Sequence, residues 1–426
     1  MRQARGKLWV AVVSATALIL VVTAGLAFAG SAGKLDRSFG DRGHVVVSNA
    51  NGYAGSLAIG RHGRIVVAGT ADNALNVARL RPNGEPDHFF GNRGVTQLVE
   101  PGVVQPYANA VAVSRKGGVI VAGTVCATER TCDITVARLT PNGEPKLSFG
   151  HGGQAEIDFP DRRDIASSVA IVRGGRILVA GSTCRPVGGD CHIALTRLQP
   201  NGELDGSFGD GGQVVSFFGH CTVTGLKGDV RSMAVDSRGR IVVGGACEQR
   251  APVALARFKP NGDLDHSFGN RGRVNKDAGI RAADALAVDS RDRVYAAGNA
   301  GGPALGVARL GIKGKIDRSF GRHGTAIAKF RFDRRIGPVP HSVGIDSNRH
   351  VVVTGSSGRS GFVFARFKRS GRVDRGFGDD GHLITGRARG FRDEAAGAID
   401  SRNRIVGAGS TGSGSDRRFV LMRVLG

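Results

Sequence analysis

Four polar residues of different chemical kinds occupy the same position in a repeated pattern. Seven short apolar segments of the chain each end in a glycine: Gly69, Gly123, Gly181, Gly245, Gly298, Gly355 and Gly409. Fourteen residues before them stand Gly55, Asn109, Ser167, Arg231, Asp284, His341 and Ala395. His341 or Asp284 could act as a general base while Arg231 holds an anionic group. In a non-catalytic protein, Arg231 and Asn109 would simply contact a ligand.

These positions also have a purely structural explanation. Each stands where a strand is predicted to begin, and water solvates polar side chains at such places in most folds. The sequence contains no HExxH, GxxxxGK[ST] or GxSxG pattern and no calcium loop. We therefore predict no catalytic residue, no metal site and no cofactor.

A turn of the form Phe-Gly-x-x-Gly recurs through the chain. Its phenylalanines are Phe39, Phe90, Phe149, Phe208, Phe268, Phe320 and Phe377. A period above fifty residues is typical of propellers. Each unit contains the pattern of four short strands, as in the hairpin 232–246 and the segments that follow it. The sequence predicts an all-β, seven-bladed β-propeller of four-stranded antiparallel blades.

The repeat also predicts how the ring closes. An Arg stands eleven residues before the Phe in six units, but the seventh, Arg423, has only three residues after it. Its missing Phe-Gly half is the isolated copy at 35–43. We therefore expect an N-terminal outer strand to complete the C-terminal blade, which removes two open sheet edges.

The segment ALARFKPNGDLDHSFGNRG resembles the delta-60 repeat, a family of bacterial β-propeller units without an assigned general function. The resemblance covers about residues 35 to 426. The segment MAVDSRGRIVVGG is similar to an NHL repeat, a related propeller unit found in binding modules and in some enzymes. Both resemblances imply the same propeller fold.

The repeated arginines need partners if both faces of their strand are covered. An Asp stands three residues before the Phe in six units: Asp36, Asp87, Asp205, Asp265, Asp317 and Asp374. The unit of Arg138 has Lys146 there instead. We predict structural ion pairs, among them Arg79–Asp87, Arg197–Asp205 and Arg257–Asp265. A ligand array is the alternative, but a ligand site rarely repeats sevenfold.

Six cysteines stand in loops that follow the second strands or precede the first. Register within the repeat favours the disulfides Cys126–Cys132 and Cys184–Cys191, which leaves Cys221–Cys247 as the third. A metal site is the rival explanation, although the spacings lack a CxxC pair.

The first residues resemble an export segment. Arg2, Arg5 and Lys7 precede an apolar run from Leu8 to Ala29, so residues 1–29 are predicted to be a signal peptide or an N-terminal membrane anchor. The propeller would then occupy 34–426. We expect an exported protein, either secreted or anchored to the outer face of the cytoplasmic membrane, with membrane contact only through this segment.

The formal net charge is +23, or 23 − 3 = +20 without residues 1–29. Such a surface suits an anionic envelope polymer, or another envelope protein, as the unknown partner. No specific nucleic-acid motif is present.

Loops of unequal length, which include 330–341 and 386–394, should form one face, where binding sites normally lie. The sequence favours a non-catalytic ligand-binding or protein-interaction module of the envelope or exterior, with a propeller lyase or hydrolase as the alternative.

Overall fold

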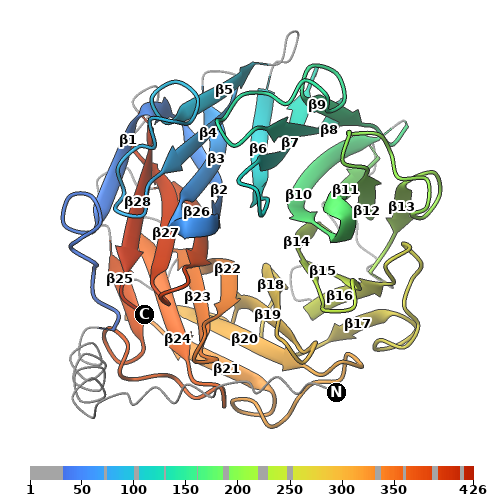
Figure 1. Ribbon diagram of the computed structural model, residues 1–426. Coiled ribbons are helices and arrows are strands. Elements are labelled where there is room, and N and C mark those ends of the chain that lie inside the picture. The colour runs from blue at the N-terminus through green and yellow to red at the C-terminus, as the bar shows by residue number, and fades with distance from the viewer. Residues whose placement is uncertain are drawn as a thin grey trace, which may run out of the picture.

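The computed structural model describes residues 32–71, 74–99, 105–128, 131–160, 162–185, 191–218, 229–246, 253–331, 337–357, 361–385, 392–412 and 417–426. Within these ranges, seven sheets of four antiparallel strands stand around a central axis (Figure 1). The predicted seven-bladed propeller is confirmed. Apart from the strands, the described residues contain two single-turn 3₁₀ helices, Arg61–Gly63 and Arg173–Gly175.

The strands run from the inside to the outside of each blade. Blade 1 holds β2 (Tyr53–Ile59), β3 (Ile65–Ala71), β4 (Ala74–Leu80) and β5 (Val95–Val99). Blade 2 holds β6 (Gln105–Val113), β7 (Val119–Cys126), β8 (Cys132–Leu139) and β9 (Gln154–Ile157). Blade 3 holds β10 (Arg163–Ile171), β11 (Ile177–Cys184), β12 (Cys191–Leu198) and β13 (Gln213–Ser216). Blade 4 holds β14 (Val230–Val235), β15 (Ile241–Gly245), β16 (Val253–Phe258) and β17 (Arg273–Lys276).

The remaining blades repeat this order. Blade 5 holds β18 (Ala285–Val288), β19 (Val294–Asn299), β20 (Ala304–Leu310) and β21 (Thr325–Lys329). Blade 6 holds β22 (Val339–Ile345), β23 (Val351–Ser356), β24 (Phe362–Phe367) and β25 (His382–Thr385). Blade 7 holds β26 (Arg392–Ile399), β27 (Ile405–Thr411), β28 (Arg418–Val424) and, from the other end of the chain, β1 (His44–Asn51).

The ring closes in blade 7. Strand β1 pairs antiparallel with β28, with His44 opposite Met422 and Val47 opposite Phe419. Figure 1 shows the blue β1 beside the red β28. Leu35 forms a further bridge to Val424. The predicted closure by an N-terminal outer strand is confirmed, and β1 covers the edge that β28 would otherwise leave open.

The core lies between the blades. Strands β4, β7 and β11 are buried along their whole described length, because a middle strand is covered on both faces by neighbouring blades. One apolar cluster joins Ile134 and Val136 of blade 2 to Val179 and Ala194 of blade 3. The phenylalanine of every Phe-Gly turn is fully buried in these interfaces. The repeat motif therefore supplies interblade packing.

The predicted segment 1–29 lies outside the described residues. In the part of the chain that the structure describes, no helix is both long and apolar enough to cross a membrane.

Candidate ligand site at the channel mouth

In five blades, a β-bulge in the inner strand changes the direction in which one residue points. The strand pairing skips Gly55, Asn109, Ser167, Arg231 and His341, each of which is the extra residue between two regular pairs. A bulge turns its extra residue away from the regular alternation of the strand. In these five blades the bulge falls on the residue that the sequence pattern singled out, whereas Asp284 precedes β18 and Ala395 is regularly paired with Gly409.

The recurring glycines are explained by the same bulges. Gly69, Gly181 and Gly355 stand directly opposite the residue that precedes the bulge. A Cβ at Gly181 would lie 2.1 Å from the carbonyl oxygen of Ile165, and one at Gly69 would lie 1.9 Å from that of Tyr53. Only glycine leaves room for the backbone of the inner strand at this point.

Hydroxyl groups connect the inner strands of neighbouring blades. Ser56 Oγ accepts a hydrogen bond from the N–H of Val111 at 3.1 Å, and Ser232 Oγ accepts one from Leu286 at 3.0 Å. These serines directly follow the bulged position. They fix the spacing between adjacent inner strands and so hold the bulged residues in a ring.

The ring surrounds a cavity of about 470 Å³. Six of the seven predicted positions line it, and their blades follow one another around the axis: Gly55, Asn109, Ser167, Arg231, Asp284 and His341. The side chain of Ala395 lies outside the described residues. Because β6 begins at Gln105, opposite Cys126, this mouth opens on the face that carries the disulfide loops.

Arg231 and Asp284 form an ion pair across two blades. Arg231 Nη1 donates to Asp284 Oδ1, and the Asp284 side chain is only 9% exposed while that of Arg231 is 43% exposed. Burial raises the pKa of Asp284, although the charge of Arg231 opposes the shift. Asp284 precedes β18, and its N–H bonds to the carbonyl of Ala297. The pair leaves other guanidinium donors of Arg231 without a polar contact among the described residues.

The other two polar positions are held by their own blades. His341 Nε2 lies 3.0 Å from Ser356 Oγ, and Asn109 Oδ1 accepts a hydrogen bond from Thr124 Oγ1 at 3.1 Å. The sequence did not predict these anchors, nor the apolar lining that Met233 and Val339 contribute. The Arg231–Asp284 pair was also missed, because the two residues are 53 positions apart in different blades.

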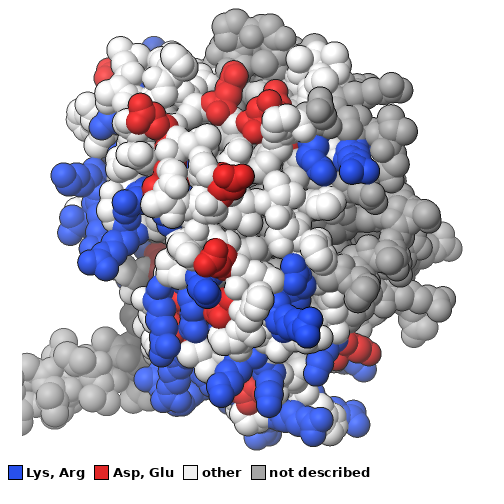
Figure 2. Space-filling model, turned by 90° about the vertical axis from the view of Figure 1, so that its right-hand side faces the viewer, with Lys and Arg blue, Asp and Glu red and all other residues white. Residues whose placement is uncertain are grey.

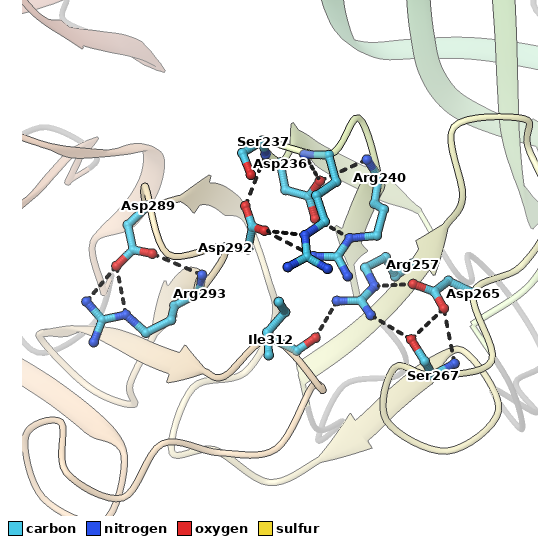
Figure 3. A network of polar contacts seen from close by, with 11 residues as sticks. Asp236, Ser237, Arg240, Arg257, Asp265, Ser267, Asp289, Asp292, Arg293 and Ile312 are labelled. Carbon is cyan, nitrogen blue, oxygen red and sulfur yellow. Dashed lines mark hydrogen bonds and ion pairs between the residues drawn. The ribbon is translucent and has the colours of Figure 1, made fainter.

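The repeated arginines lie on the opposite face, at the uniform turns. Figure 3 shows one of them: Arg257 Nε donates to Asp265 Oδ2 at 2.8 Å, and its Nη2 donates to Ser267 at 3.1 Å. Arg257 Nη1 also donates to the carbonyl of Ile312 in the next blade. The guanidinium stacks 4.4 Å from the ring of Phe268. Arg257 therefore ties its turn to the neighbouring blade, and Arg79, Arg138, Arg197, Arg309 and Arg423 make the equivalent bond.

The same Arg–Asp contact occurs in six units of the described chain. The Nε–Oδ2 distances lie between 2.7 and 2.9 Å for Arg79–Asp87, Arg197–Asp205, Arg257–Asp265, Arg309–Asp317, Arg366–Asp374 and Arg423–Asp36. In the seventh unit Arg138 has no carboxylate partner among the described residues, because Lys146 replaces the Asp, but it donates to the carbonyl of Pro200. The arginine side chains of these six pairs are mostly buried and are bonded to their aspartates, as the sequence predicted.

Two disulfides close the hairpins of blades 2 and 3. Cys126 bonds to Cys132 and Cys184 to Cys191, and in each pair the two residues stand directly opposite one another in the strand register. These are two of the three predicted pairs. The third, Cys221–Cys247, lies outside the described residues.

A larger hollow of about 830 Å³ lies between the outer strands of blades 3 and 4. It is lined by Phe217, Phe218 and Arg273, whose guanidinium stacks 4.4 Å from the Phe217 ring. Arg273 also donates to the carbonyl of Phe217. These groups satisfy one another, whereas the channel mouth gathers polar side chains from several blades.

Comparison with known proteins agrees with the fold. Residues 63–90, 175–208 and 239–268 match a family model described as "Domain of unknown function (DUF5122) beta-propeller". The matched segments end at Phe90, Phe208 and Phe268, so each covers the same part of one repeat. No curated protein sequence matches the chain. The finer resemblance to delta-60 and NHL units stays a prediction.

Solved propellers superpose on nearly the whole chain. The virginiamycin B lyase of Staphylococcus aureus is 11% identical with a TM-score of 0.50, over 89% of this chain and 98% of the lyase. A catalytically inactive variant of that lyase with quinupristin is 10% identical with a TM-score of 0.52, over 89% and 98%. The PQQ-bound aldose sugar dehydrogenase of Streptomyces coelicolor is 15% identical with a TM-score of 0.43, over 89% and 98%. The similarity to the two lyase structures agrees with the β-propeller fold of this chain, and at such identities it shows the fold alone.

Proposed function

We propose that this protein is an exported, non-catalytic binding module whose channel mouth takes a small ligand with an anionic group. The observation that carries the proposal is the ring of bulged residues, which brings Arg231, Asn109 and His341 to one cavity. Convergent polar groups above an apolar lining are typical of small-molecule sites.

Arg231 is the main anchor in this proposal. Its guanidinium is oriented by the buried carboxylate of Asp284 and is still 43% exposed. An arginine that is already fixed loses little conformational entropy when it binds a carboxylate or phosphate, and it can bind two oxygens at once. Asn109 and His341 would then select among anions through hydrogen bonds.

A lyase or hydrolase is the second candidate, because an imidazole and a carboxylate line the same cavity. His341 would serve as the base, since Asp284 is already paired with Arg231. One structurally similar protein is a lyase that was crystallised as an inactive variant with quinupristin. At 10% identity, that similarity supports only the statement that a β-propeller can carry such chemistry.

Export is supported by the two disulfides, which persist in oxidising compartments. The basic composition suits an anionic envelope polymer or an acidic envelope protein as the partner. On the side of the ring that Figure 2 shows, Lys and Arg are interspersed with Asp and Glu and are densest towards the lower edge. Such a mixed surface favours local recognition at a site over a single continuous polymer track.

The test is a thermal-shift screen of the full chain with small carboxylates, phosphates, sulfates and uronic-acid oligosaccharides. We expect at least one anion to stabilise the wild-type protein. The variant Arg231→Met should bind that anion at least about tenfold more weakly, since a charge-assisted hydrogen bond contributes about 1.5–3 kcal/mol.

The matched control is Arg238→Met, which removes the same charge from an exposed turn of the same blade. It should leave the affinity unchanged. Equal losses in both variants would indicate a general charge effect and would contradict the proposed site. Turnover of a stabilising ester or glycoside, abolished by His341→Gln, would favour the enzyme instead.

A further inference from the structure

Three carboxylates converge between blades 2 and 3, and none of them lines the cavity at the channel mouth. Asp133 lies in β8, Asp158 directly follows β9, and Asp164 lies in β10. One carboxylate oxygen from each lies within 4.8 Å of those of the other two. Like charges at such separations repel strongly unless a cation or a proton compensates them.

Asp164 is the unusual member of this cluster. Its side chain is fully buried, and Oδ2 accepts a hydrogen bond from the N–H of Phe159 at 2.7 Å. Its other oxygen, Oδ1, makes no hydrogen bond of normal geometry to the described residues, although Thr183 stands opposite Asp164 in the strand register and its hydroxyl is a neighbour of the carboxyl group. A buried oxygen without a partner is destabilising, and more so when it is charged. Burial raises the pKa of Asp164 to about 6, the Thr183 hydroxyl and the Phe159 N–H oppose this shift, and the charges of Asp133 and Asp158 add to it.

The nearby cations do not compensate the cluster. Arg162 and Arg163 precede Asp164 in the chain, but Arg162 Nη1 has no hydrogen-bond partner among the described residues. Arg163 Nε is directed to Cys132 Sγ at 3.5 Å, and that sulfur belongs to a disulfide, so it offers no thiolate ligand.

The cluster is not a by-product of the repeat. The positions equivalent to Asp164 in the other units hold Gly52, Pro106, Gly228, Arg281, Pro338 and Arg392. The positions equivalent to Asp133 hold Ala74, His192, Pro252, Ala304, Gly361 and Arg418. The fold therefore needs no acid at either place, and yet both acids stand together at this one interface.

We propose that Asp133, Asp158 and Asp164 form a divalent-cation site between blades 2 and 3, with Ca²⁺ as its ion. The ligands are carboxylate oxygens, which suit hard cations and disfavour Zn²⁺. Three carboxylates in one cluster favour Ca²⁺ over Mg²⁺, which binds through one or two carboxylates and keeps several waters. The ion would neutralise the repulsion, satisfy the buried oxygen and tie two blades together next to the Cys126–Cys132 disulfide.

The experiment is calorimetric titration of CaCl₂ into the EDTA-treated full chain, with thermal unfolding measured in parallel. We expect binding of one ion with a Kd of about 10⁻⁴ to 10⁻³ M, as in extracellular Ca²⁺ modules, and a melting temperature that rises by a few degrees. Asp164→Asn should abolish both responses. Without Ca²⁺ this variant should melt no lower than the wild type, because the amide keeps the bond to Phe159 and removes a repelling charge.

Asp133→Asn serves as the second variant, since Asp133 is only half-buried and its replacement leaves the hydrogen bond of Asp164 intact. It should also lose the Ca²⁺ response. The matched control, Asp210→Asn, removes an exposed acid from a turn and should respond like the wild type. Absence of heat and of a melting shift in the wild type, or a full response in Asp164→Asn, would overturn the proposal.

Discussion

Replacing Asp265 by Ala is expected to lower the free energy of unfolding by about 3–5 kcal/mol. The reason is the arginine that remains, since the Arg257 side chain is 2% exposed and would keep its charge in the interior without the carboxylate that is hydrogen-bonded to it. Its bonds to Ser267 and Ile312 cannot neutralise that charge. Denaturation by guanidinium chloride, compared with the wild type, measures the loss.

The unit of Arg138 provides the reverse experiment. Because Lys146 stands where the other units have Asp, Lys146→Asp should create the missing pair and raise stability by about 1 kcal/mol. If Asp265→Ala changed stability by less than about 0.5 kcal/mol, a value typical of surface sites, the structural role of these pairs would be contradicted.

Asp265 also gives this prediction a pH dependence. Burial alone would raise its pKa, but the hydrogen bonds from Ser267 and the charge of Arg257 outweigh it and hold the pKa below the usual value. A lowered folded-state pKa contributes stability that is present above the unfolded value of about 3.9 and is lost as the pH falls through the folded value. The difference between wild type and Asp265→Ala should therefore shrink below about pH 4.

Replacing Phe39 by Ala is expected to be equally severe, with a loss of about 3–5 kcal/mol. Phe39 is fully buried in the cluster that joins blade 1 to blade 7, which also contains Ile65 and Leu421. The guanidinium of Arg423 lies 4.5 Å from its ring. The substitution removes packing and a cation–π contact at the one blade built from both ends of the chain. Thermal unfolding of the full chain measures the effect.

Phe89→Ala is the control for this substitution. It removes the same side chain from a homologous turn, but Phe89 is 77% exposed and should contribute less than about 0.5 kcal/mol. Similar melting temperatures for both variants would mean that the N-terminal strand does not close the ring as described.

The sequence was sufficient for the architecture because the fold is built from copies. The seven Phe-Gly turns predicted the blades, and the incomplete unit at Arg423 predicted the closure by β1. Register between copies likewise predicted the bonds Cys126–Cys132 and Cys184–Cys191. The contacts between blades recur with each sequence repeat, so comparing the seven repeats with one another predicts those contacts.

The parts that do not repeat were harder to predict. Nothing in the local sequence marks a β-bulge at Asn109 or His341, because a bulge is a mismatch between two strands. The pairing of Arg231 with Asp284 depends on the distance between two blades. The carboxylates around Asp164 come from three separate segments, so they form no sequence motif.

The central claim is that the bulged residues of the inner strands form a ligand site. The most direct measurement is calorimetric titration of the triple variant Arg231→Ala, Asp284→Ala and His341→Ala with the strongest anion from the screen. Because Arg231 and Asp284 are removed together, neither charge of the pair is left buried without its partner. The variant should therefore fold with the circular dichroism spectrum of the wild type. The account predicts that its affinity falls by at least about tenfold. A folded triple variant that binds the anion with wild-type affinity would contradict it.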